Sequence, residues 1–278
     1  MKRTVRDVAK KVITQFLKKI GLRILTHRGW NQILELAADR EKKIEEIRNN
    51  QIDLNFIGSL SGSGFADNFL ISRYLQQAKN SKSGFRQDVI ALALNSFTTE
   101  GFFIEVGACD GIATSNSLLL ERDFKWKGIL IEPAIVWHED LKRNRSAIID
   151  TRCAWRESGI SLLFEENESP GHSGINATGQ LASNAKVRYQ VETITLNDLL
   201  FENKVKGPIN FLSIDTEGSE LDVLKGLNFD LHRPRFICVE HNFEIEKRDA
   251  ILEMMSNHGY HRLLPEFSFV DDWYIAES

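Results

Sequence analysis

The residues best suited to chemistry lie in one stretch, Phe102–Ser117 (FFIEVGACDGIATSNS). The apolar run Phe102–Val106 contains one acid, Glu105, and is followed by Gly107–Gly111 (GACDG) and then by small and polar residues. This order predicts a buried parallel strand, a tight glycine turn and the start of a helix. Glycine permits close backbone approach, and a helix start presents unpaired N–H groups to a ligand. We therefore expect a ligand-binding turn, with simple strand–helix packing as the alternative.

A second acid follows a second apolar run. Gly128–Glu132 (GILIE) ends in Glu132, which comes 21 residues after Gly111. This interval places the end of a second strand beside the first in a doubly wound sheet, where a carboxylate can accept both hydroxyls of a ribose. The glycine spacing, Gly-x-x-x-Gly, differs from that of dinucleotide sites. Together with the carboxylate of Glu105, it favours a cationic ligand such as S-adenosylmethionine (SAM).

Two further apolar runs also end in polar residues. Ile209–Glu220 (INFLSIDTEGSE) predicts a strand that ends at Asp215 and a helix that rises from Ser219. Arg235–Glu240 predicts another strand, with His241 directly after it. Because the carboxyl ends of parallel strands meet at one edge of a sheet, these side chains are expected near the glycine turn.

Each of these residues has a functional and a structural interpretation. Asp215 is expected to contact the ammonium of SAM or to act as base towards an acceptor hydroxyl. His241 is the best separate base, because imidazole titrates near neutrality, unless it is a satisfied strand-end histidine. Glu217 binds substrate or favours the positive end of a helix. Asp215, Glu240 and His241 could hold a divalent ion, but their spacing does not establish one, and we predict no metal site.

The elements that must position these residues alternate along the chain, which predicts an α/β fold. Strands are expected at Phe102–Val106, Gly128–Glu132, Ala147–Ala154, Ile160–Glu165, Tyr189–Thr195, Ile209–Asp215, Arg235–Glu240, His261–Leu264 and Trp273–Ala276, and helices at Ala66–Lys79, Val89–Leu94, Ser115–Arg122, Ala134–Asn144 and Glu244–His258. The last two strands lie too close in sequence for a helical crossover and should pair antiparallel. The long polar stretch Asn167–Lys186 is expected to be a loop that closes over the acceptor.

The first residues differ from the rest in charge. Met1–Arg28 carries nine Lys or Arg residues and one acid, with apolar residues at helical spacing on one face. Such a helix suits the surface of an anionic membrane, or packing against a second subunit in a homodimer. Trp30–Ile47 predicts a second helix and Gly58–Gly64 a linker. We expect residues 1–64 to form a helical extension and residues 65–278 the main domain.

The composition sets broader limits. The chain has 278 residues, a net charge of −4 and 42% hydrophobic residues, as expected for a globular protein that is not a general nucleic-acid binder. Its three cysteines show no metal-type spacing, which favours a reducing cytoplasm. No apolar stretch approaches the ~20 residues of a membrane span.

Taken together, the motifs from about Ser83 to Ala276 resemble the FkbM-type family of SAM-dependent methyltransferases. The markers are Gln87-Asp88, Glu105–Gly111, Ser115-Asn116, Trp126–Ile129, Ile131–Pro133, Asn144-Arg145, Leu212–Glu220, Val239–Asn242 and Asp272–Tyr274. The resemblance implies a class I methyltransferase fold, a mostly parallel sheet with an antiparallel terminal strand. It also implies SAM as cofactor and O-methylation of a hydroxyl on a sugar, glycan or related metabolite. Residues 1–81 are not covered.

The resemblance also implies roles for individual residues. Glu105, Gly107 and Gly111 would hold the amino-acid end of SAM, Glu132 its ribose, and Cys153 and Ala154 would lie beside the adenine. The complete expected cofactor set is Glu105, Gly107, Ala108, Asp110, Gly111, Ser115, Asn116, Glu132, Pro133, Cys153, Ala154 and Asp215, and the expected catalytic set is Asp215, Glu217 and His241. Asp110 has an alternative role as a helix cap.

Two other functions compete with methyl transfer. A nicotinamide-dependent sugar oxidoreductase could use a related sheet, but the glycine spacing and the absence of a Tyr-x-x-x-Lys pair argue against it. A non-catalytic, membrane-recruited scaffold would not need the acids Glu105, Glu132 and Asp215. The acceptor itself cannot be identified from the sequence.

Overall fold

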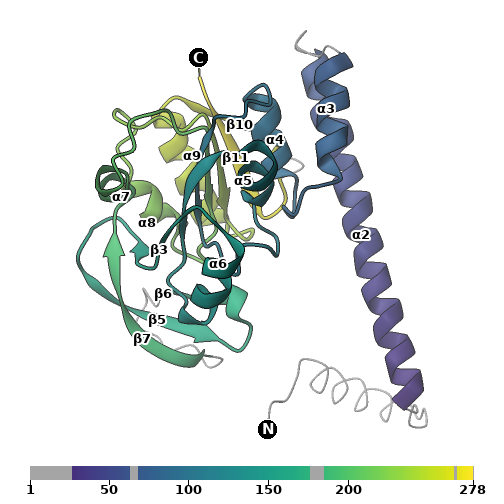
Figure 1. Ribbon diagram of the computed structural model, residues 1–278, viewed down its shortest axis with the longest axis horizontal. Coiled ribbons are helices and arrows are strands. Elements are labelled where there is room, and N and C mark those ends of the chain that lie inside the picture. The colour runs from purple at the N-terminus through teal and green to yellow at the C-terminus, as the bar shows by residue number, and fades with distance from the viewer. Residues whose placement is uncertain (1–26, 63–67, 176–184, 266–267, 278) are drawn as a thin grey trace. The chain divides into compact units, whose positions relative to one another are not determined.

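The computed structural model describes residues 27–62, 68–175, 185–265 and 268–277. The chain divides into two compact units, Met1–Gln51 and Ile52–Ser278. Helix α2 (His27–Gly62) runs through this boundary (Figure 1). Its residues Ile52 and Phe56 are buried in the core of the second unit. The boundary between the two ranges thus falls within α2, and the first residues of the predicted linker, 58–62, are helical.

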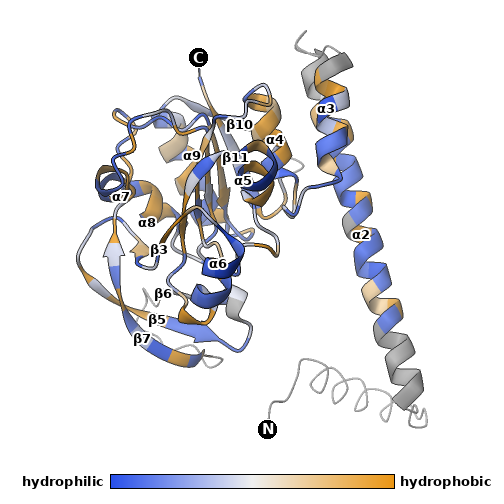
Figure 2. Ribbon diagram, in the orientation of Figure 1, coloured by the Kyte–Doolittle hydropathy of each residue, from blue (hydrophilic) through white to orange (hydrophobic). Residues whose placement is uncertain are grey.

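The predicted basic helix Met1–Arg28 lies outside the described residues, except for its last two. In the part of the chain that the structure describes, no helix combines the length and the apolarity needed to cross a membrane. The described residues of α2 are mostly hydrophilic, whereas α4 (Gln87–Leu94) is strongly apolar and α8 (Glu220–Lys225) mixes charged and apolar residues (Figure 2).

The second unit is built on a sheet of seven strands. They are β1 (Phe102–Val106), β2 (Lys127–Ile131), β3 (Ile148–Asp150), β8 (Phe211–Ile214), β9 (Phe236–Glu240), β10 (Tyr260–Leu263) and β11 (Asp271–Ala276), in the spatial order β10-β11-β9-β8-β1-β2-β3. β11 pairs antiparallel with both β9 and β10, and the other pairs are parallel. The predicted antiparallel pairing is thus confirmed. The antiparallel strand is last in the chain but one position inside the edge of the sheet.

Alternating side chains of these strands build two apolar layers. Ile104, Ile129 and Leu212 belong to the layer formed with helices α7 (Leu196–Glu202), α8 and α9 (Ile245–Asn257). Their neighbours Phe103, Leu130 and Phe211 belong to the opposite layer, formed with α3 (Asn68–Ala78), α4, α5 (Leu118–Phe124) and α6 (His138–Asn144). Strands covered on both faces carry continuous apolar runs, which explains the sequence pattern.

Two predicted elements differ from the structure near the site. α5 begins at Leu118 and not at Ser115, because the glycine turn continues into an irregular segment that ends at Ser117. The predicted strand Ala147–Ala154 is divided into β3 and β4 (Cys153–Ala154), which belong to different sheets. The predicted helix Ala134–Asn144 consists of a 3-10 turn, η1 (Ile135–Trp137), followed by α6.

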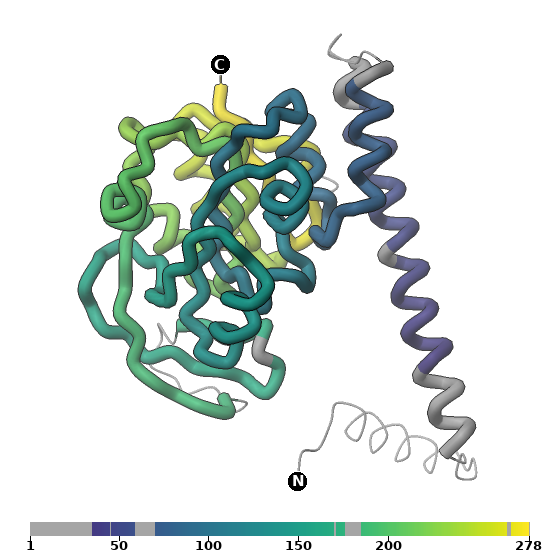
Figure 3. Tube along the Cα trace, viewed as in Figure 1, coloured from purple at the N-terminus to yellow at the C-terminus, as the bar shows by residue number. Residues whose placement is uncertain are grey.

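A second sheet of four strands is inserted between β3 and α7. Its strands are β4, β5 (Ser161–Asn167), β6 (Gly174–Ile175) and β7 (Ala185–Ile194), in the order β4-β7-β5-β6. β5 and β7 form a long antiparallel hairpin (Figure 3). The predicted polar loop Asn167–Lys186 is therefore partly structured: it holds the 3-10 turn η2 (Pro170–His172), β6 and the start of β7. We call residues 161–194 the hairpin arm.

Candidate active site

A pocket of about 530 Å³, part of it open to solvent, lies at the carboxyl ends of the parallel strands. The residues that line it come from the ends of β1, β2, β4 and β8 and from the hairpin arm: Val106, Gly107, Cys109, Glu132, Pro133, Cys153, Ala154, Phe164, Gly171, Ser173, Ile175, Asp215, Thr216, Glu217 and Ser219. Ligands of open α/β sheets bind in the crevice at this edge. The pocket brings together Gly107, Glu132, Pro133, Cys153, Ala154, Asp215 and Glu217 of the sequence-predicted residues.

Glu132 is a buried carboxylate at the end of β2. Its Oε2 accepts a hydrogen bond of 2.7 Å from the N–H of Cys109, and its Oε1 accepts one of 2.7 Å from the N–H of Ala134. Burial nevertheless raises the pKa of Glu132 to about 7, because it outweighs these two donors. Each carboxylate oxygen has a second lone pair, so Glu132 can still accept two hydroxyl groups from a ligand.

Gly107 adopts a φ of +87°, and its Cα faces the backbone of Asp215. Cys109, two residues later, also has a positive φ, of 48°. Burial and the surrounding carboxylates raise the pKa of the Cys109 thiol, so this thiol is neutral and contributes no nucleophile. The predicted glycine turn is present, and it brings β1 and β8 close together at the pocket.

The structure places Glu105 differently from the expectation. The Glu105 side chain accepts hydrogen bonds from Ser115 Oγ (3.0 Å), from the N–H of Asn116 (2.7 Å) and from Ser117 Oγ. The buried guanidinium of Arg145 lies 3.6 Å from the same carboxylate. Glu105 is thus satisfied inside the protein and does not line the pocket, so its predicted contact with the cofactor has no support in the geometry.

The other predicted residues of the turn also fail to line the pocket. Asp110 Oδ1 accepts 2.8 Å hydrogen bonds from the N–H groups of the two residues that follow Gly111. A Cβ at Gly111 would lie 2.6 Å from Arg145, so this glycine serves packing. Asn116 donates to Ser213 Oγ at 2.9 Å. These residues, together with Ala108 and Ser115, do not line the pocket and hold the turn through internal hydrogen bonds and packing.

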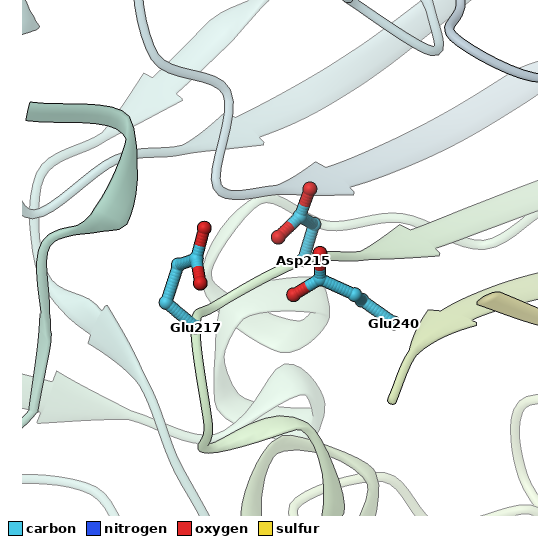
Figure 4. A group of neighbouring side chains, drawn as sticks. All are labelled: Asp215, Glu217 and Glu240. Carbon is cyan, nitrogen blue, oxygen red and sulfur yellow. The ribbon is translucent and has the colours of Figure 1, made fainter. Parts of the chain in front are cut away.

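Three carboxylates meet at the ends of β8 and β9. Asp215, Glu217 and Glu240 each offer an oxygen within 4.8 Å of the others, and Figure 4 shows these three side chains converging. Burial, the hydrogen bond between Asp215 and Glu240, and the charge of Glu217 raise the pKa of Glu240 to about 10. Burial and nearby carboxylates also raise the pKa of Asp215, to about 7. This acidic cluster can hold a cationic group, and at neutral pH it retains at least one proton of its own.

His241, predicted as a separate base, is not part of this cluster. Successive residues of an extended chain point to opposite faces. The ring of His241 is buried with its Nε2 3.7 Å from Asp272 Oδ1, and its Nδ1 accepts a hydrogen bond from the N–H of Phe243 at 3.0 Å. Two arginines, Arg248 and Arg262, also pair with Asp272. His241 therefore belongs to a structural network, and the carboxylate that completes the cluster is Glu217.

The hairpin arm supplies three pocket residues, Phe164, Ser173 and Ile175, that the sequence did not single out. Phe164 and Ile175 form an apolar wall of the pocket opposite the strand ends, and Gly171 and Ser173 also line it. His172 lies between these last two, and its Nδ1 is 2.8 Å from Glu217 Oε1. The glycines and the histidine in a polar stretch were visible in the sequence, but nothing there indicated their contact with β8.

The chain shows similarity to known proteins in sequence and in structure. A segment of 112 residues, which is 40% of this chain, is 27% identical to hexuronic acid methyltransferase AglP of Haloferax volcanii and spans 44% of that protein. Among solved structures, a chain of the fibrillarin/Nop5p complex aligns with a TM-score of 0.38 and 11% identity, over 70% of this chain and 84% of that one. Residues 105–262 match the family described as the methyltransferase FkbM domain.

The matched region runs from the end of β1 to β10 and therefore includes every strand end that lines the pocket. The sheet order, with a final antiparallel strand inserted beside the edge, is that of a class I methyltransferase. The chain belongs to the family of methyltransferase FkbM domains.

Proposed function

We propose that this protein is a SAM-dependent O-methyltransferase that acts on a hydroxyl group of a sugar or glycan. The observation that carries the proposal is the pairing of two acidic sites across one pocket: Glu132 on one side, with free lone pairs, and the acidic cluster on the other. SAM has the complementary groups, a ribose diol at one end and an ammonium at the other.

The residues present fit this cofactor. Glu132 would accept the ribose hydroxyls, and Asp215 in the acidic cluster would hold the ammonium. Phe164, Ile175 and the buried side chain of Cys153 give the pocket an apolar wall suited to the adenine ring. When bound, SAM supplies an activated methyl group. The protein then has to hold the acceptor oxygen in line with that methyl group, exclude water and remove a proton.

The sugar acceptor rests on different support. The relative from Haloferax volcanii is named as a hexuronic acid methyltransferase, which favours a carbohydrate acceptor for this chain as well. A reducing cytoplasm is the location that we propose for this protein. Its three cysteines are free thiols, which supports that proposal.

Calorimetry with S-adenosylhomocysteine, SAM and NAD tests the cofactor. The full-length chain should bind the first two and not NAD. Glu132→Ala should weaken that binding by at least tenfold, because two hydroxyl acceptors are lost at a buried position. The matched control is Glu139→Ala, a glutamate whose side chain is 92% exposed on α6. Binding of NAD, or unchanged binding of S-adenosylhomocysteine by Glu132→Ala, would contradict the proposal.

Methyl transfer itself is tested with methyl-labelled SAM and a set of 4-nitrophenyl glycosides of neutral hexoses, deoxyhexoses and hexuronic acids. Label should appear in a sugar product as a methyl ether, which resists mild alkali. A labelled methyl ester, which alkali removes, would show transfer to a carboxylate and contradict the proposed hydroxyl acceptor.

A further inference from the structure

The hairpin arm and the end of β8 meet at a histidine–carboxylate pair. His172 Nδ1 lies 2.8 Å from Glu217 Oε1, although the two residues are 45 positions apart. The backbones are close as well, because a Cβ added at Gly174 would lie 3.3 Å from the carbonyl oxygen of Thr216 and 3.4 Å from that of Glu217. The arm is therefore packed on the β8 loop at the pocket, and the pair follows from that packing.

The backbone around His172 is held in place. Asn167 Nδ2 donates to the carbonyl oxygen of His172, and Ser173 Oγ accepts a hydrogen bond of 3.1 Å from the N–H of Asn167. The residues on both sides of His172, Gly171 and Ser173, line the pocket, as does Glu217. The side chain of His172 is 70% exposed, and its Nε2 has no hydrogen-bond partner among the described residues. One ring nitrogen is thus oriented by Glu217, which lines the pocket, and the other is exposed to solvent.

We propose that His172 is the general base of the methyl transfer and that Glu217 is its positioning residue. This inference rests on the proposed function and adds the group that takes the acceptor proton. A base held by a carboxylate through one ring nitrogen can accept a proton at the other, and the carboxylate stabilises the imidazolium that forms. Asp215 and Glu240 are less suited to this role, because they already share a proton within the acidic cluster.

The step balances without a further reactant. The acceptor oxygen forms a bond to the methyl carbon while the bond from that carbon to sulfur breaks, and the electron pair of the broken bond stays on sulfur. The hydroxyl proton moves to Nε2 of His172. The products are the methyl ether, S-adenosylhomocysteine and an imidazolium, which returns its proton to solvent through its exposed edge.

The pair also narrows the acceptor class. A carboxylate acceptor carries no proton at neutral pH and needs no base, and the acidic cluster beside Glu217 would repel it. A hydroxyl acceptor needs proton removal and is neutral. The site therefore fits a sugar hydroxyl better than the carboxylate of a hexuronic acid.

The test compares wild type, His172→Ala, Glu217→Gln and a matched control, His261→Ala, whose histidine is exposed on β10 away from the pocket. Each protein is assayed with methyl-labelled SAM and the 4-nitrophenyl glycosides, and its binding of S-adenosylhomocysteine is measured by calorimetry. His172→Ala should lower kcat by about 10²-fold or more, the scale of a lost acid–base group, with the affinity for S-adenosylhomocysteine unchanged. Added imidazole should restore part of the rate in His172→Ala. Glu217→Gln should retain more activity than His172→Ala, and His261→Ala should match wild type.

Full activity of His172→Ala, or a loss that imidazole does not restore, would overturn the role of His172 while leaving the methyltransferase proposal intact. A methyl ester as the product of the wild-type protein would also overturn the role of His172, because methylation of an ionised carboxylate needs no base. Absence of methyl transfer by the wild type to any of the glycosides would contradict the proposed function, and the base assigned to it would fall with it.

Discussion

The Cα of Gly107 faces the main-chain carbonyl of Asp215 so closely that an added Cβ would lie 1.8 Å from the carbonyl oxygen. Gly107 begins the turn after β1, and Asp215 follows β8, the neighbouring strand. The N–H of Asp215 also donates to the carbonyl oxygen of Val106 at 3.0 Å. The glycine therefore allows two strand ends to converge, and it brings the first residue of the acidic cluster to the pocket.

Replacing Gly107 with alanine should destabilise the protein as well as weaken cofactor binding. The positive φ and the displaced carbonyl together should cost about 2–5 kcal/mol of unfolding free energy. Gly159→Ala is the matched control, because Gly159 also has a positive φ, of 77°, but no atom within 4 Å of an added Cβ. Urea unfolding should show the larger loss for Gly107→Ala. Equal losses in the two variants would show that the contact with Asp215 contributes nothing.

Binding of S-adenosylhomocysteine should depend on pH through Asp215. The pKa of Asp215 is raised to about 7, and an ammonium binds the ionised carboxylate. Affinity should therefore be full above pH 7 and fall as the pH drops below it, by up to about tenfold per pH unit for one proton. Calorimetry between pH 5.5 and 8.5 measures this. Asp215→Asn should bind S-adenosylhomocysteine weakly at every pH. Asp140→Asn, a control on α6, should show the pH dependence of the wild type. A wild-type affinity that does not change with pH would contradict the contact between Asp215 and the ammonium.

Arg145 should prove essential for folding. Its buried guanidinium donates to Glu121 Oε2 at 2.7 Å and to Ser117 Oγ at 2.7 Å, and it lies 3.6 Å from Glu105. Arg145→Met leaves two carboxylates without their cation and should cost about 3–5 kcal/mol. Arg143→Met, which removes only an exposed pair with Asp140, should cost less than about 1 kcal/mol. Thermal unfolding distinguishes the two, and similar midpoints would contradict this account of Glu105 as a structural residue.

His241 should affect stability and not methyl transfer, which is the reverse of the expectation from sequence. His241→Ala removes the acceptor of the Phe243 N–H at a buried site, which should cost about 1–3 kcal/mol. His241→Asn, which offers another acceptor, should recover part of that loss. The folded fraction of either variant should keep wild-type kcat. A large drop in kcat with an unchanged melting temperature would restore His241 as a catalytic candidate.

The membrane contact of the basic amino-terminal segment stays a prediction from sequence. Each basic residue near an anionic surface contributes about 1 kcal/mol, so the full chain should pellet with anionic vesicles in low salt and less so in high salt. A chain that starts at His27 should stay in the supernatant. Unchanged vesicle binding after truncation, with conversion of a dimer to a monomer in analytical ultracentrifugation, would identify the segment as a dimerisation element instead.

The central sheet could be predicted because its information is local. Apolar runs such as Phe102–Val106 and Gly128–Glu132, each closed by a turn or an acid, mark buried parallel strands wherever they occur. The positions of Glu132 and Asp215 at the pocket follow from the same logic, since carboxyl ends of neighbouring parallel strands share one edge. The linker at Gly58–Gly64 was a weaker inference, because a few glycines do not end a helix that is supported by packing of Ile52 and Phe56.

The direction of a side chain at a strand end could not be predicted from sequence. Glu105, Asp215 and His241 all follow or end apolar runs, yet only Asp215 reaches the pocket. Glu105 is satisfied by the segment that includes Ser115 and Ser117. The ring of His241 is buried beside Asp272 and accepts a hydrogen bond from the N–H of Phe243. The hydrogen-bond and charge partners of a polar side chain near a pocket come from segments that folding brings close. The spacing of residues in the sequence does not identify those partners.

The sequence by itself therefore determined the strands of the central sheet, the glycine turn and the two acids, Glu132 and Asp215, because these depend on periodicity and on short-range turn chemistry. Its ordered series of motifs also indicated the family. Only the tertiary structure decided the rest of the site. The packing of η2 and β6 against the loop after β8 brings His172 to Glu217, and the parallel pairing of β8 with β9 gathers Asp215, Glu217 and Glu240. The physical reason is that these contacts join residues far apart in the chain, so they exist only after the sheet and the hairpin arm have packed.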